Sequence, residues 1–201
     1  MLCAFMLTAA LAADPATRLT ESEAGAKVAE FVRKEKPKAV VPPILKVTDL
    51  TTDNVWKKLK VQVVRIQPDE LAGGEAFLLQ GDRVRPIGES FGGEGVTSLA
   101  VLEAGERPIL VYAFAWGSGE HRSQLAALDV SDPKAEEISL LPANFSDRDF
   151  NVRNTADGAV AVSASRIHVG HILAERRNGS LQVRFNLTKD QLPRDLRESL
   201  R

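Results

Sequence analysis

The chain has 201 residues, of which 44% are apolar, and its 26 lysines and arginines nearly balance its 27 aspartates and glutamates. This length is sufficient to bury the core of one domain, or of two small ones. A net charge of −1 lacks the basic excess that nucleic-acid and anionic-membrane surfaces require, so we expect no nucleic acid and no stable membrane insertion.

The first thirteen residues, MLCAFMLTAALAA, are uncharged and apolar and end in small side chains. Ala10-Leu11-Ala12 has the small-x-small pattern at which secretory signals are cleaved, although no basic residue precedes it. The stretch is too short to span a bilayer. We therefore expect a signal peptide at 1–13 and an exported protein, periplasmic or extracellular; a buried N-terminal helix is the alternative. Cleavage removes Cys3, the only cysteine, and with it any disulfide.

An N-terminal helix is predicted over 20–36. Thr20 and Glu23 have the spacing of a capping box, and Pro37 ends the helical pattern. The apolar stripe of this helix is thin, so we expect the helix on the surface or against a partner. A single helical turn is expected at 53–58.

From Leu59 the apolar pattern changes to a period of two. The phase slips at Val64 and resumes at Ile66, which predicts a β-bulge. The longest apolar run, 108–116 (PILVYAFAW), is typical of a strand buried on both faces. Further strands are expected, in chain order, at 75–80, 83–87, 96–102, 124–130, 137–141, 150–154, 159–165, 172–177 and 180–187.

Two dipeptides predict tight hairpin turns. Asp157-Gly158 and Asn178-Gly179 lie between strand candidates and favour the positive φ angles of a type I′ turn. A continuous strand over 159–177 would be unusually long, which predicts a turn or a bulge at Gly170. A short C-terminal helix is expected over 188–201.

The pattern indicates an all-β fold, because strands and turns follow one another without alternating helices. We expect an antiparallel meander of about ten strands, arranged as a sandwich, a barrel or a propeller-like fold, with a short helix near each end. The strands group into about three meanders of three or four. The expected domains are the signal peptide at 1–13, a helix and linker at 14–46, and one β-rich domain at 47–201.

Residues 103–110, EAGERPIL, resemble the turn of an FG-GAP-type β-propeller repeat, in which an acidic, glycine-bearing loop precedes an apolar strand. The resemblance extends over 103–117 and implies a propeller blade. In that family the loop often binds calcium, but the usual aspartates are absent here. Glu103 and Glu106 supply too few oxygens for calcium, so we infer no calcium site.

Chain reversal at every predicted turn brings distant loops to one rim of the sheet. The FGGEG loop (91–95) and the GSGEHRS loop (117–123) become neighbours there, joined by 142–149. Glycine-rich loops with an arginine favour an anion, and an indole ring stacks on sugars. The competing interpretation is two tight turns with solvated side chains. The candidate ligand-binding residues are Gly92, Gly93, Trp116, Ser118, His121, Arg122 and Ser123.

The histidines raise two possibilities, a metal site and a hydrolytic site, and the sequence offers no supporting motif for either. His168 and His171 lie on opposite faces of a continuous strand and converge only if the chain bends between them. We expect no metal and no cofactor. A hydrolytic trio of a serine, His121 and Asp129 can be assembled, but no G-x-S-x-G elbow accompanies it, and we assign no catalytic residue.

These patterns favour an exported binding protein over an enzyme. The expected partner is a small anionic or sugar-like ligand, or a protein, at the glycine-rich rim formed by 91–95 and 116–123. A secreted hydrolase that uses His121 with a nearby serine or acidic residue is one alternative. A structural or inhibitor-like module that docks on a protein through an edge strand or the N-terminal helix is the other.

Overall fold

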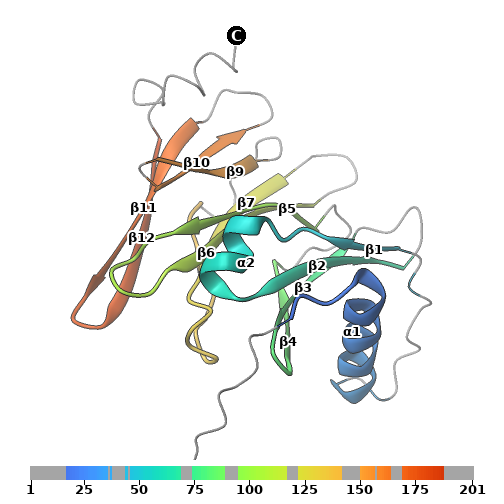
Figure 1. Cartoon of the computed structure of the whole chain (residues 1–201). Coiled ribbons are helices and arrows are strands. Elements are labelled where there is room, and N and C mark those ends of the chain that lie inside the picture. Colours follow the sequence, from blue (N-terminus) through green and yellow to red (C-terminus); the bar gives the residue numbers. More distant parts are fainter. Residues whose placement is uncertain are drawn as a thin grey trace, which may run out of the picture.

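The computed structural model describes residues 17–35, 37, 44, 46–68, 74–88, 95–116, 122–141, 150–156, 158–163 and 169–187. Within these ranges the chain forms two helices, α1 (Glu21–Glu35) and α2 (Asp53–Leu59), and twelve strands. The strands make three antiparallel sheets of four, and each sheet uses four consecutive strands (Figure 1).

Each sheet is a simple up-and-down meander. The first contains β1 (Lys46–Asp49), β2 (Gln62–Gln67), β3 (Glu75–Gln80) and β4 (Arg83–Ile87). The second contains β5 (Gly95–Leu102), β6 (Ile109–Trp116), β7 (Arg122–Leu128) and β8 (Ile138–Ser139). The third contains β9 (Phe150–Thr155), β10 (Gly158–Ser163), β11 (Val169–Arg177) and β12 (Ser180–Leu187). The predicted antiparallel β class is confirmed, and the three sheets agree with the predicted grouping into about three meanders of three or four strands. A single continuous meander of about ten strands is not found among the described residues.

The second sheet is the centre of the molecule and is buried on both faces. Leu110 and Tyr112 of β6 belong to the core shared with the first sheet, whereas Ile109 and Val111 belong to the core shared with the third. Alternate residues of a strand point to opposite faces, so a continuous apolar run fills both cores. The prediction for 108–116 is therefore confirmed.

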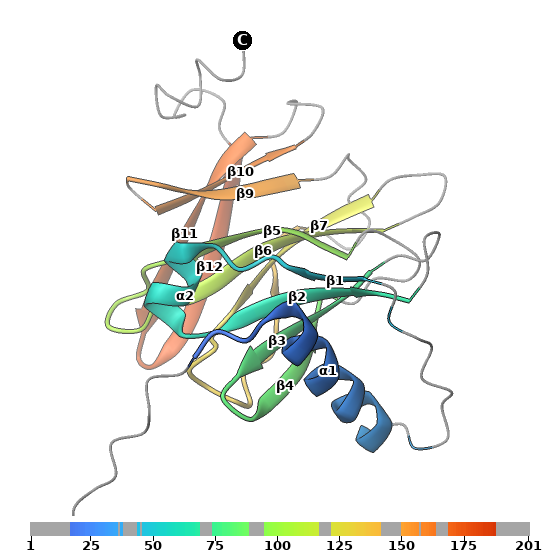
Figure 2. The same cartoon turned by 45° about the vertical axis from the view of Figure 1, so that its right-hand side comes forward.

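Helix α1 covers the outer face of the first sheet (Figures 1 and 2). Ala24 and Val28 pack there against Val64 of β2, while Val63 faces the core on the other side. The neighbouring apolar residues Val63 and Val64 thus serve two different faces. The β-bulge predicted at Val64 is wrong, because β2 pairs with β1 and β3 in unbroken register. The register shift that does occur lies in β5, next to Thr97.

Both helices begin at side-chain caps. The backbone N–H of Thr20 donates to Glu23 Oε2 at 2.8 Å and the N–H of Glu23 donates to Thr20 Oγ1 at 3.3 Å, so the predicted capping box is confirmed. Helix α2 begins at Thr52, whose Oγ1 accepts from Val55 N, and ends at Lys60 with a φ of 53°. The residue predicted to begin the first regular strand, Leu59, therefore ends a helix.

One of the predicted turns is confirmed by the structure and the others differ from it. Asn178 and Gly179 have φ angles of 51° and 81°, which confirms the predicted turn between β11 and β12. Gly158 already pairs with Thr155 as the first residue of β10, so it does not belong to the predicted two-residue turn, and Asp157 lies outside the described residues. Gly170 lies inside β11 and pairs with Ala161 and Leu187, so the turn or bulge predicted there is wrong. The helix predicted at 188–201 and the segment 1–13 lie outside the described residues.

Candidate functional site

One end of the second sheet collects segments that are distant along the chain. Gly95 pairs with the residue before Trp116, and Trp116 pairs with Arg122. The side-chain amide of Gln124 donates to Leu141 O at 3.1 Å and accepts from Leu141 N at 3.0 Å. The start of β5, the end of β6, the start of β7 and Leu141, two residues after β8, therefore lie at the same end.

The third sheet is aligned with that end. Thr97 Oγ1 near the start of β5 donates to Phe150 O at the start of β9, at 3.2 Å. Phe150 pairs with Ser163, so β10 also ends there. The described flanks of 88–94, 117–121, 142–149 and 164–168 thus share one end of the molecule, which we call the Trp116 end. Candidate residues Gly92, Gly93, Ser118 and His121 lie outside the described residues, so their part of the site stays a prediction.

Three candidate residues are described, and their environments differ. Trp116 is partly buried against the first core, and its ring stacks on Phe114 with centroids 5.6 Å apart. Arg122 is exposed on the neighbouring strand, whereas Ser123 is only 1% exposed. Trp116 and Arg122 are directly paired across β6 and β7, so their side chains lie on the same face of the sheet. Ser123 is too buried to meet a ligand at the surface.

The hydrolytic trio cannot include Asp129. Residue 121 directly precedes β7, and Asp129 directly follows it, so the seven-residue strand lies between them. A strand rises about 3.3 Å per residue, which puts Arg122, the first residue of β7, and Asp129 about 23 Å apart. Asp129 is instead bonded to Ser131 and Arg176. No other described carboxylate is assigned as the acid partner of His121.

The described part of the chain holds no group of three or more His, Cys, Asp or Glu side chains placed to bind a metal ion. His171 lies in β11, where it pairs with Val160 of β10 and Asn186 of β12. His168 is outside the described residues.

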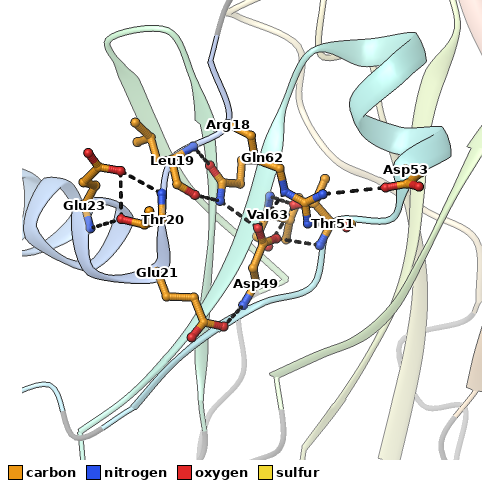
Figure 3. Close-up of polar contacts among 10 residues, drawn as sticks. All are labelled: Arg18, Leu19, Thr20, Glu21, Glu23, Asp49, Thr51, Asp53, Gln62 and Val63. Atoms are coloured by element: carbon orange, nitrogen blue, oxygen red, sulfur yellow. Dashed lines mark hydrogen bonds and ion pairs between the residues drawn. The ribbon is translucent and has the colours of Figure 1, made fainter.

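The largest described polar network fixes the start of α1 to the first sheet (Figure 3). Gln62 is only 2% exposed; its amide nitrogen donates to Leu19 O and to Asp49 Oδ2, both at 2.8 Å, and its oxygen accepts from Leu19 N at 3.0 Å. Arg18 donates from Nε to Asp49 Oδ2 at 2.9 Å and from Nη2 to Thr51 O at 2.7 Å. Burial raises the pKa of Asp49, but hydrogen bonds from Arg18, Thr51 and Gln62 outweigh it and lower the pKa overall. Because these groups satisfy one another, the network is a structural clamp.

A cleft of about 670 Å³ lies at the opposite end of the sheets. It is lined by the β7–β8 connection, by the β11–β12 hairpin and by Arg107 of the β5–β6 turn. At its base Arg176 Nη2 donates to Asp129 Oδ2 at 2.5 Å, which joins the third sheet to the second. Sequence reasoning missed this cleft, because Arg176 and Asp129 are 47 residues apart and neither belongs to a recognisable motif.

A scan of family models finds no match to this chain, and searches of the curated proteins and of the solved structures find none either. Neither described helix is long and apolar enough to cross a bilayer.

Proposed function

We propose that this chain is an exported binding protein whose ligand meets the Trp116 end. The observation that carries the proposal is the alignment of the second and third sheets. Gly95, Trp116, Arg122, Leu141 and Phe150 are spread over more than fifty residues, yet strand pairing and side-chain bonds hold them at one end. Binding residues concentrate on connections that a rigid scaffold positions, and export is supported by the apolar segment 1–13.

The ligand class follows from the described side chains at that end. The guanidinium of Arg122 suits a carboxylate or phosphate, because it donates several N–H groups in one plane. The adjacent indole of Trp116 is held by its stacking on Phe114 and supplies a flat apolar surface. The pair favours a small anionic or sugar-like ligand. Gly92, Gly93, Ser118 and His121 complete the predicted set.

We further propose a propeller-like arrangement of the sheets. Two observations support it. Each sheet is a four-stranded meander. The first strands of consecutive sheets, β5 and β9, run side by side in the same direction, because the residues bonded between them rise together along both strands. Ser98 Oγ accepts from Val152 N at 2.8 Å, and farther along the same two strands Asn154 Oδ1 accepts from Val101 N at 3.1 Å. Blades of a propeller have this organisation.

The test is a ligand screen with matched variants. Phosphate, citrate, glucose and N-acetylglucosamine are tested for a rise in melting temperature, and any binder is titrated by calorimetry. Arg122→Ala and Trp116→Ala are expected to weaken such a binder about tenfold or more, because each removes a direct contact. Arg153→Ala, an exposed arginine on β9, is the control and should leave binding unchanged. Equal binding by all variants, or no binder in the panel, contradicts the proposed site.

A further inference from the structure

The cleft between the second and third sheets has walls of opposite charge. Its base is the ion pair of Arg176 and Asp129, and the Asp129 side chain is only 9% exposed. Asp129 also accepts from Ser131 Oγ at 2.6 Å and from Ser131 N at 3.1 Å. The Arg176 charge is therefore already balanced, and both side chains are fixed in place.

Three charged groups of the lining have no such balance. Arg107 makes no hydrogen bond or ion pair in the described part of the chain, and the same is true of the Glu136 carboxylate. Asp132 accepts only the backbone N–H of Lys134, at 2.9 Å, among the described residues. Arg107 comes from the β5–β6 turn, whereas Asp132 and Glu136 come from the β7–β8 connection. Ile138 and Leu181 give the lining an apolar part.

Arg176 adds unused donor capacity on the cationic side. Its Nε donates to Ala104 O at 3.2 Å and its Nη2 donates to Asp129, so these bonds orient the guanidinium plane. A guanidinium has five N–H donors. Its Nη1 group has no acceptor among the described residues, and Arg176 lines the cleft. An anionic group that reaches Arg107 would gain a second, already oriented donor.

We propose that this cleft is a second binding site, for a zwitterion that carries a carboxylate and an ammonium group, as amino acids and short peptides do. The carboxylate meets Arg107 and Arg176, the ammonium meets Asp132 and Glu136, and an apolar side chain covers Ile138 and Leu181. A purely anionic ligand would face two uncompensated carboxylates, and a purely cationic one would face Arg107. Only a ligand with both charges complements all three unbalanced groups.

The dipeptide glycyl-leucine is the probe, and it is titrated into the full chain labelled with ¹⁵N. The amide signals of the protein that change position are expected to belong to the β7–β8 connection and the β11–β12 hairpin. Arg107→Ala and Glu136→Gln should each weaken binding about fivefold, the effect of losing one exposed ion pair. N-acetyl-glycyl-leucine and glycyl-leucinamide, which each lack one charge, should bind more weakly than the dipeptide by a similar factor.

Two further results decide the matter. Arg122→Ala, at the other end of the sheets, should bind glycyl-leucine as the unaltered chain does, which separates this site from the one proposed above. Equal affinity for the dipeptide and its two blocked forms overturns the zwitterion. No shift at about 20 mM dipeptide, far above the affinity of a useful site, or shifts confined to the Trp116 end, overturn the site itself.

Discussion

The two interfaces between sheets are built differently. The interface between the first and second sheets is apolar at its centre, and the hydroxyl of Tyr112 is buried there without a hydrogen bond of normal geometry in the described structure. The interface between the second and third sheets is apolar too, but side chains bridge its margin. Asn154 donates to Val101 O, Ser98 accepts from the opposite strand, and Arg176 pairs with Asp129. The first interface depends mainly on shape, with a polar bridge at its margin where Gly88 N donates to Glu137 Oε1 at 3.1 Å. The second interface depends more on particular polar residues.

The largest effect is expected inside the third sheet, at Gly170. A Cβ at this position lies 2.1 Å from Asn186 O and 2.7 Å from Asn186 C, and these are backbone atoms of the paired strand. Gly170→Ala should cost about 3 kcal/mol or more, because β11 and β12 must separate. Urea unfolding measures the cost, and amide hydrogen exchange should show lost protection in β11 and β12 before the other sheets.

Gly81→Ala is the matched control for this substitution. Gly81 has a φ of 54° and no atom within 4 Å of the added Cβ, so only backbone strain of about 1 kcal/mol is expected. Equal costs for the two substitutions would show that β11 and β12 are not in the contact described.

The next largest effect is expected from Asp129→Asn. The substitution leaves Arg176 without its counter-charge between the second and third sheets, which should cost about 2 kcal/mol. The unfolding free energy measures this cost. Glu175→Gln, which alters two exposed ion pairs beside Arg176 on β11, is the control and should cost less than about 0.5 kcal/mol.

Asp129→Asn should also reduce the slope of the unfolding free energy against pH in the acidic range. Burial raises the pKa of Asp129, but bonds from Ser131 and Arg176 outweigh it, so the folded pKa lies below the unfolded one. The stabilisation is therefore complete above the unfolded value near pH 4 and is lost as the pH falls through the folded value. Asp129→Asn should lose less stability than the unaltered chain between about pH 5 and 3. An unchanged slope would contradict the ion pair.

A smaller effect is expected from Asn154→Ala. This removes the amide that bonds both Val101 N and Val101 O, and the bond from Asn54 as well. The loss should be about 1–2 kcal/mol. Asn151→Ala, an exposed position on the same strand, should change stability by less than about 0.5 kcal/mol. Equal unfolding free energies for the two variants in chemical denaturation would show that Asn154 does not bridge the two sheets.

The smallest effect belongs to the first interface. Tyr112→Phe removes a buried hydroxyl that makes no hydrogen bond of normal geometry among the described residues, so the variant should be as stable as the unaltered chain or up to about 1 kcal/mol more stable. Burial, together with the nearby Glu137 carboxylate, raises the pKa of Tyr112 well above its ordinary value, so the hydroxyl is neutral at working pH. A loss above about 1 kcal/mol in thermal unfolding would mean that the hydroxyl has a partner.

The sequence predicted local elements well wherever one residue type decides the conformation. The Thr20–Glu23 capping box and the Asn178-Gly179 turn were correct because both depend on short-range bonds or backbone angles. The bulge at Val64 was wrong because burial of both faces of β2 depends on α1, which lies far away in the sequence. The turn at Gly170 was wrong because the glycine accommodates a neighbouring strand and does not reverse the chain.

The candidate site was predictable only in part, for the same reason. Reversal of the chain at each turn was sufficient to bring Trp116 and Arg122 to one end with the flanks of other loops. The Arg176–Asp129 pair and its cleft arise from the stacking of two sheets, which no local pattern specifies. The sequence alone therefore allows Asp129 to act with His121, whereas the structure places β7 between the two positions.

The central claim is that distant segments build one end of the molecule around Arg122, and paramagnetic relaxation tests it most directly. A nitroxide label is placed by Arg122→Cys in a Cys3→Ser background. We expect broadened amide signals at Gly95, Leu141 and Phe150, and sharp signals at Glu106 and Asn178, which lie at the far end of the sheets. Sharp signals at Leu141 and Phe150, or broadened ones at Asn178, would contradict the shared end.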